Sequence, residues 1–124
     1  MTSQLPTAFQ TWLDVLAQSG KSRDTCGAYQ RGIRHFWRWY THVYQTPFDP
    51  DRVMPRDIRD WKAHQQQVDG AAPATVNQRL SAVKQFFRWA QQNDWCRRNP
   101  TADTHAIRWQ PGKMGVFAYS LESA

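Results

Sequence analysis

The chain has 124 residues and a mass of 14.5 kDa, enough for one domain with a single modest core. Hydrophobic residues make up 40 %, and the seven Trp, four Tyr and six Phe provide large rings for that core, which excludes a disordered chain. The formal net charge is +6, and most of the cations are arginines. Because guanidinium groups bind phosphates and guanine edges in a bidentate manner, this excess favours a nucleic-acid partner over a membrane.

Several classes of protein are excluded by what the sequence does not contain. It has no apolar run near the ~18 residues of a membrane span, and its first residues do not resemble a signal peptide. Cys26 and Cys96 lie far apart without a CxxC partner, and the four histidines are scattered. These spacings predict no metal site, no disulfide framework and no cofactor. We therefore expect a cytosolic protein.

Two helices are predicted in the first half of the chain. The first begins after Pro6 and ends at Ser19-Gly20, and its apolar stripe has helical spacing: Phe9, Trp12, Leu13 and Leu16. The second is capped by Ser22 and extends to about Tyr44. Its apolar stripe comprises Tyr29, Ile33, Phe36, Trp37, Tyr40 and Tyr44. The prolines in residues 46–50 then predict a loop.

Two further helices are predicted before residue 100. The third starts at Pro55 and ends near Asp69-Gly70, with Ile58 and Trp61 directed inward. The fourth starts between Pro73 and Thr75 and continues to about Asn93. It has the clearest helical period in the sequence, formed by Val76, Leu80, Val83, Phe87 and Ala90. Since no alternating strand pattern of useful length is present, the sequence predicts an all-α fold.

The positive charge is concentrated on two of the four predicted helices. Residues 22–48 contain four Arg and one Asp, and residues 71–100 contain five basic residues and one Asp. Residues 49–70 contain four basic residues and five Asp, which is typical of a salt-bridged solvent face. The excess charge of the second and fourth helices has no partner nearby in the sequence.

The basic residues of these two helices lie opposite their apolar stripes. In an α-helix each residue is rotated by ~100° from the one before it. On the fourth helix this rotation directs four polar side chains within about sixty degrees of one another around the helix axis: Asn77, Ser81, Lys84 and Arg88. Gln78 and Gln85 lie beside them. On the second helix the corresponding residues are Arg23, Arg31, Arg34 and Arg38. Cations next to amides and hydroxyls suit phosphates and base edges. Two such helices predict binding to one side of duplex DNA.

The order and spacing of several short motifs resemble a known family. Ser22-Arg23-Asp24-Thr25, then Tyr29 and Phe36, precede residues 54–58, which read MPRDI. Residues 75–90 read TVNQRLSAVKQFFRWA and are followed by Asn99-Pro100. Over residues 8–105 this pattern resembles the N-terminal domain of tyrosine recombinases, the phage integrase group. The resemblance implies a SAM-like core-binding domain, a four- to five-helix orthogonal bundle that forms one half of a C-shaped clamp on DNA.

The resemblance also implies which residues contact DNA. By the resemblance, the residues expected to contact DNA are Ser22, Arg23, Thr25, Thr75, Asn77, Gln78, Arg79, Ser81, Lys84 and Arg88. The charge pattern adds Lys21, Arg31 and Arg34, and the polar face of the fourth helix adds Gln85. The family's catalytic Tyr, Arg and His residues belong to a C-terminal domain that we do not find in this sequence, so we expect no enzyme activity. Residues 1–106 are then the DNA-binding domain and residues 107–124 a linker toward the catalytic domain, either in a truncated chain or in a short stand-alone protein.

Two alternatives remain open at this stage. A small helix-turn-helix regulator would use the fourth helix for recognition, but the connection at residues 69–73 is longer than the usual tight turn. A helical accessory subunit of a transposition complex would use its Trp residues to bind protein. The partners expected from these readings are double-stranded DNA and either other recombinase protomers or a transposase, with no membrane.

Overall fold

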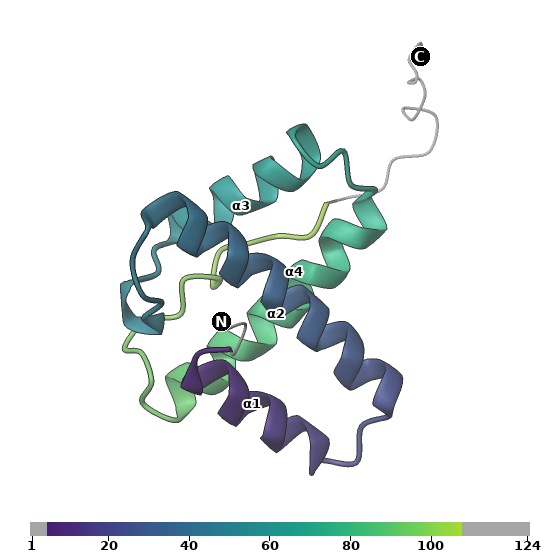
Figure 1. Cartoon of the computed structure of the whole chain (residues 1–124), viewed down its shortest axis with the longest axis vertical. Helices are drawn as coiled ribbons and strands as arrows, with labels where there is room; N and C mark the ends of the chain where they lie inside the picture. Colours follow the sequence, from purple (N-terminus) through teal and green to yellow (C-terminus); the bar gives the residue numbers. More distant parts are fainter. Residues whose placement is uncertain (1–4, 108–124) are drawn as a thin grey trace.

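The computed structural model describes residues 5–107, which form four α-helices and one short 3-10 helix (Figure 1). The elements are α1 (Thr7–Ala17), α2 (Arg23–Tyr44), η1 (Pro50–Arg52), α3 (Pro55–Gln67) and α4 (Pro73–Gln92). All four predicted helices are confirmed, each within about two residues at both ends. Pro50, the last residue of the predicted loop at residues 46–50, is the first residue of η1, which was not predicted from the sequence. Within residues 5–107 the fold is all-α, and none of these helices is long and apolar enough to cross a membrane.

Local hydrogen bonds explain where the helices start. The Ser22 hydroxyl oxygen accepts from the Thr25 backbone N–H at 3.1 Å, which confirms Ser22 as the N-cap of α2. The Asp49 carboxylate accepts from the Asp51 backbone N–H at 3.0 Å and thereby starts η1. At the start of α3, the Asp57 carboxylate accepts from the Met54 backbone N–H and from the Tyr44 hydroxyl. The buried Asp57 therefore joins the end of α2 to the start of α3.

Large aromatic rings fill the core, as the composition predicts. The fully buried rings include Phe9, Phe36, Trp61, Phe86 and Phe87. The ring centroids of Phe36 and Trp61 are 5.0 Å apart in an edge-to-face arrangement, and Phe86 packs in the same way on Phe87 at 5.0 Å. Phe86 lies outside the predicted stripe of α4. It is buried because α4 packs against α1 as well as α2, so α4 needs a wider apolar face than one partner requires.

Three further tryptophans pack on this core. Trp39, Trp89 and Trp95 are partly buried against it, and the rings of Trp89 and Trp95 are nearly parallel with centroids 6.0 Å apart. Their packing leaves less exposed aromatic surface for a protein partner than the accessory-subunit alternative would use.

The centre of the fold is the crossing of α2 over α4 (Figure 1). The two helices are in close contact at Gly32, which is buried. A β-carbon placed on Gly32 would lie 2.8 Å from the Ala82 Cβ and 3.3 Å from the Arg79 Cα. Since real side chains do not approach so closely, glycine at this position allows the two backbones to come together.

After α4 the chain turns back over the bundle. Residues 101–107 run between α3 and α4 and bring the described chain to an end near the start of α4 (Figure 1). Apart from Ile107, the predicted linker at residues 107–124 lies outside the described residues.

Candidate nucleic-acid interface

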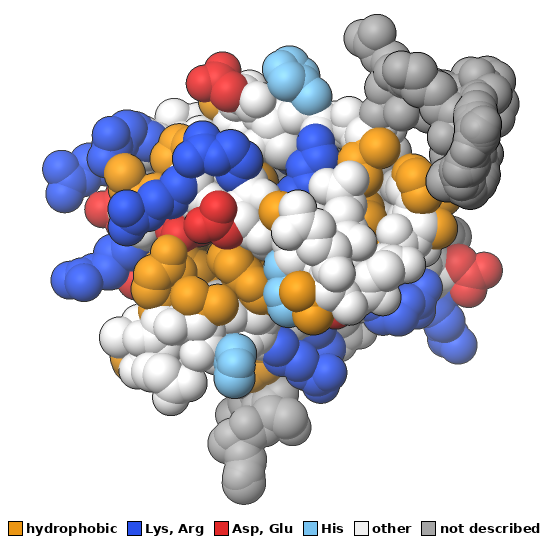
Figure 2. Space-filling view, turned by 90° about the horizontal axis from the view of Figure 1, so that it is seen from above, with side chains coloured by type: hydrophobic (Ala, Val, Ile, Leu, Met, Phe, Trp, Pro, Cys, Tyr) orange, Lys and Arg blue, Asp and Glu red, His pale blue; other side chains and the backbone are white. Residues whose placement is uncertain are grey.

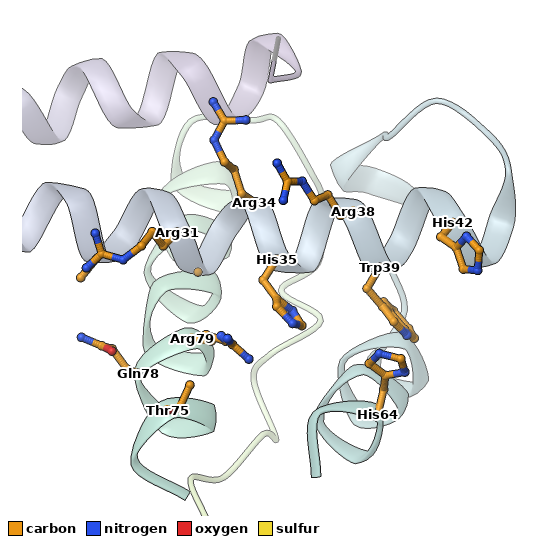
Figure 3. Close-up of a pocket in the computed structure, with 12 residues that line it drawn as sticks. Arg31, Arg34, His35, Arg38, Trp39, His42, His64, Thr75, Gln78 and Arg79 are labelled. Carbon is orange, nitrogen blue, oxygen red and sulfur yellow. The ribbon is translucent and has the colours of Figure 1, made fainter. Parts of the chain in front are cut away.

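A basic hollow of about 600 Å³ lies where α2 passes α4 and the C-terminal half of α3 (Figure 3). Four arginines line it: Arg31, Arg34 and Arg38 from α2, and Arg79 from α4. The α2 residues Trp39 and His42 and the α3 residue His64 extend its wall. In Figure 3, Arg34 and Arg38 extend from the side of α2 away from α4, whereas His35 and Arg79 point toward each other between the helices. The hollow therefore has an arginine rim and an imidazole-rich interior.

A second hollow of about 410 Å³ continues along the two helices toward the start of α2. Thr25 and Tyr29 from α2 and Ser81 from α4 contribute to its wall. Ala28 and Gln78 line both hollows, so the two adjoin each other. We call the combined surface the α2–α4 groove. It places the cations of one helix beside the amide and hydroxyl groups of the other.

Three side chains that line the groove converge on Asp69 in the loop between α3 and α4. His35 Nε2 lies 2.9 Å and His64 Nε2 3.4 Å from its carboxylate oxygens, and Arg79 Nη1 lies at 4.0 Å. The same guanidinium donates to the Gln65 side-chain oxygen at 3.2 Å. Arg79 thus has partners that are distant in the sequence, which a local charge count does not include. The pairing also fixes Arg79 at the inner wall of the groove.

Hydrogen bonds on both ring nitrogens determine the tautomer of His35. The Trp61 indole N–H, which can only donate, lies 2.9 Å from Nδ1, so Nδ1 is the acceptor and Nε2 carries the proton given to Asp69. Burial lowers the pKa of His35 below its ordinary value of 6.5, and the neighbouring Arg79 guanidinium lowers the pKa further against the opposing effect of Asp69. His35 is therefore held in its neutral form between α2 and α3.

This arrangement predicts a loss of stability in mild acid. Because the pKa of His35 is lower in the folded than in the unfolded state, the unfolded chain binds the proton first. The His35 contribution is fully present above pH ~6.5 and is lost progressively as the pH falls from that value toward the folded-state pKa. Urea unfolding between pH 8 and pH 5 measures this dependence. His35→Gln retains an acceptor for Trp61 and a donor for Asp69, so it should show a weaker decline; an unchanged decline would contradict the assignment.

The structure brings seven of the fourteen predicted contact residues into the α2–α4 groove: Thr25, Arg31, Arg34, Thr75, Gln78, Arg79 and Ser81. Three others, Lys21, Ser22 and Arg23, are exposed at the start of α2, where the Ser22 hydroxyl is engaged in the helix cap. Gln85 and Arg88 are exposed on α4 and extend the polar face of Gln78 and Ser81 along the helix. Asn77 and Lys84 are different, because their polar atoms bond to the backbone of residues 104–107.

The sequence analysis did not include the histidines or Asp69 in the site. One signal was available: Arg31, His35, Arg38 and His42 follow a helical period on α2, and the two histidines therefore accompany the two arginines. No pattern in the sequence indicated that α3 and the loop after it would also contribute to the site, through His64 and Asp69.

The basic residues elsewhere on the surface are mixed with acidic ones. At the left edge of the molecule, where Figure 1 places η1 and the start of α3, Lys and Arg side chains alternate with Asp or Glu (Figure 2). Arg52 pairs there with Asp49 at 3.7 Å, and Arg97 with Asp51 at 3.6 Å. Both pairs lie at η1, and none of the ion pairs among the described residues joins two residues of α3, so the salt-bridged face predicted for the third helix stays a prediction.

Comparison with known proteins identifies the same family that the sequence motifs resemble. Residues 9–97 match the family described as phage integrase, N-terminal SAM-like domain. The chain is similar to the tyrosine recombinase XerC of Neisseria gonorrhoeae, with 28 % identity over 99 residues, 77 % of this chain and 32 % of that protein. It is also similar to the tyrosine recombinase XerD of Lacticaseibacillus casei, with 30 % identity over 92 residues, 74 % of this chain and 29 % of that protein. The chain thus spans about a third of the length of these relatives. No solved structure matches it significantly.

Proposed function

The chain belongs to the family of phage integrase N-terminal SAM-like domains, and from this premise we propose that it binds duplex DNA through the α2–α4 groove. One observation carries the proposal: two helices with basic outer faces, distant in the sequence, line the same two adjoining hollows. Mixed-sign surface around η1 has no such concentration of cations. The groove is therefore the part of the described surface best suited to a polyanion.

The two helices have different tasks in this proposal. Arg31 and Arg38 on α2 are exposed and would contact phosphates, which supply affinity but carry no sequence information. On the polar face of α4, Gln78, Ser81, Gln85 and Arg88 are exposed. Amide and hydroxyl groups in the major groove read base edges, and Arg88 would contact a phosphate. α4 is accordingly the recognition element and α2 the backbone clamp.

At the level of the whole protein, we propose that this domain is the N-terminal half of a clamp around a recombination core site. Strand cleavage would then depend on a catalytic domain, either in a longer form of the chain or in a partner recombinase. Residues 1–106 would form the DNA-binding unit, and residues 107–124 the connection. The proposal implies a location in the bacterial cytoplasm, with the DNA.

Fluorescence anisotropy with a labelled duplex, measured between 50 and 200 mM salt, tests the proposal. We expect non-specific dissociation constants of about 10⁻⁴–10⁻⁶ M at physiological salt. The double variant Arg31→Ala/Arg88→Ala should make the slope of log K against log salt shallower by about two, because each lost phosphate contact contributes about 0.9.

A matched control separates specific contacts from net charge. Arg56→Ala/Arg59→Ala removes the same charge from exposed positions on α3 and should leave the slope nearly unchanged. Equal losses in both double variants would contradict binding through the groove. No duplex binding even at low salt would reject the function itself and favour a protein partner.

A further inference from the structure

The backbone of residues 104–107 is held against α3 and α4 by three polar side chains. Lys84 Nζ donates to the Thr104 carbonyl at 2.9 Å, and Lys62 Nζ donates to the His105 carbonyl at 2.7 Å. The Asn77 side chain bonds to both backbone groups of Ile107: its Nδ2 donates to the carbonyl at 3.0 Å, and its Oδ1 accepts from the N–H at 2.7 Å.

This arrangement has the properties of a dedicated docking site for an extended chain. An amide side chain matches the donor and acceptor of one peptide residue, in the way that a neighbouring strand does. The two ammonium groups satisfy carbonyls that the extended segment leaves without partners in its own backbone. The Ile107 side chain is partly buried against the hydrophobic core. Polar and apolar contacts therefore hold the same short segment.

We infer that Lys62, Asn77 and Lys84 form a backbone dock for residues 104–107, which fixes where the connecting polypeptide leaves the domain. Asn77 and Lys84 then act as positioning residues for the chain and do not contact DNA. The statement about DNA rests on the proposed function, because it divides the polar residues of α4 into two sets. Gln78, Ser81, Gln85 and Arg88 remain exposed for DNA, whereas Asn77 and Lys84 lie on the flank next to α3.

The dock fixes the position from which the polypeptide after Ile107 continues. If residues 101–107 were free, a flexible segment of this length would have an r.m.s. end-to-end distance of about 13 Å. The dock removes that freedom and places Ile107 beside Asn77, one residue from the groove residue Gln78. Residues from 108 onward therefore start from a fixed point at the edge of the proposed DNA-binding surface. This start point limits the positions that a following domain can take around the DNA.

Limited trypsin digestion of the full chain tests the dock. Cleavage after Arg108 requires several preceding residues to leave the surface, because a protease binds its substrate in an extended form. Asn77→Ala removes both bonds to Ile107, so it should raise the cleavage rate after Arg108 by about tenfold relative to the rate after Lys113 in the same molecule. Gln78→Ala, at the adjacent exposed position, is the matched control and should leave this ratio unchanged. An unchanged ratio in Asn77→Ala, with an unchanged thermal transition, would overturn the inference.

A second measurement separates the dock from the proposed function. Lys84→Ala should retain the wild-type salt dependence of duplex binding, whereas Arg88→Ala should reduce the slope by about one. If Lys84→Ala reduces the slope as much as Arg88→Ala does, Lys84 contacts DNA and its role as a positioning residue is wrong. If neither variant changes the slope, the assignment of this face of α4 to DNA is wrong. The ratio of trypsin cleavage after Arg108 to cleavage after Lys113 still decides whether the dock exists.

Discussion

Replacing Phe36 by alanine should lower the free energy of unfolding by about 3–5 kcal/mol, the usual cost of deleting a fully buried ring. Phe36 makes edge-to-face contacts with Trp61, Phe48 and Phe87, which come from three different segments of the chain. Its removal therefore leaves a cavity at the point where these segments meet. Because domains of this size are stable by only about 5–15 kcal/mol, the variant should unfold at much lower urea concentration or not fold at all.

The matched control is Val43→Ala on the same helix. Val43 is 48 % exposed, and its truncation should change stability by no more than about 0.5 kcal/mol. Urea unfolding followed by tryptophan fluorescence measures both variants. A loss below about 1 kcal/mol in Phe36→Ala would show that the ring is not at the centre of the core.

Replacing Gly32 by alanine should destabilise the α2–α4 crossing by about 1–2 kcal/mol. The new methyl group would lie 2.8 Å from the Ala82 Cβ, and overpacking of this kind costs about 1–3 kcal/mol. The higher helix propensity of alanine offsets up to about 1 kcal/mol of that cost. The substitution should also weaken duplex binding, since the two helices that line the groove would move apart.

The compensating substitution Ala82→Gly makes this prediction specific. It removes the methyl group on the opposite helix, so the double variant Gly32→Ala/Ala82→Gly should be more stable than the sum of the single changes predicts. A coupling free energy of about 1–2 kcal/mol is expected for such a direct contact. Strictly additive effects would mean that the helices do not meet at these two residues. Chemical denaturation of the three variants and the parent completes the cycle.

The helices could be predicted from the sequence because each depends on local information. Apolar spacing, the Ser22 cap and the prolines at the helix starts are contained within a few residues, and the structure follows them closely. The burial of Phe86 was missed for a different reason. A single stripe assumes one neighbouring element, whereas α4 contacts α1, α2 and α3. Gly32 was missed likewise, because a close backbone approach leaves no periodic pattern.

The candidate site was predicted only in part. Here too, the features set by local sequence were predicted and those set by contacts between distant segments were not. The charge count identified α2 and α4 as the basic helices, and the structure joins them in one groove. Arg79 pairs with Asp69, and Lys84 bonds to the Thr104 carbonyl. Both partners are remote in sequence from the residues that they contact. A helical wheel ranks residues by direction but does not show which directions another segment already covers. Asn77 and Lys84 look equivalent to Arg88 on the wheel for this reason, although the structure separates them.

The crossing at Gly32 also bears on how the domain reaches its native state. The helices that it joins, α2 and α4, are separated in sequence by η1 and the whole of α3, and they make more contacts with each other than any other pair of helices. Individual helices form within about a microsecond, whereas this pairing has to close a long intervening loop first. We therefore expect the folding rate to be limited by the meeting of α2 and α4. The pair that forms the proposed DNA-binding groove would then also be the nucleus around which the remaining helices assemble.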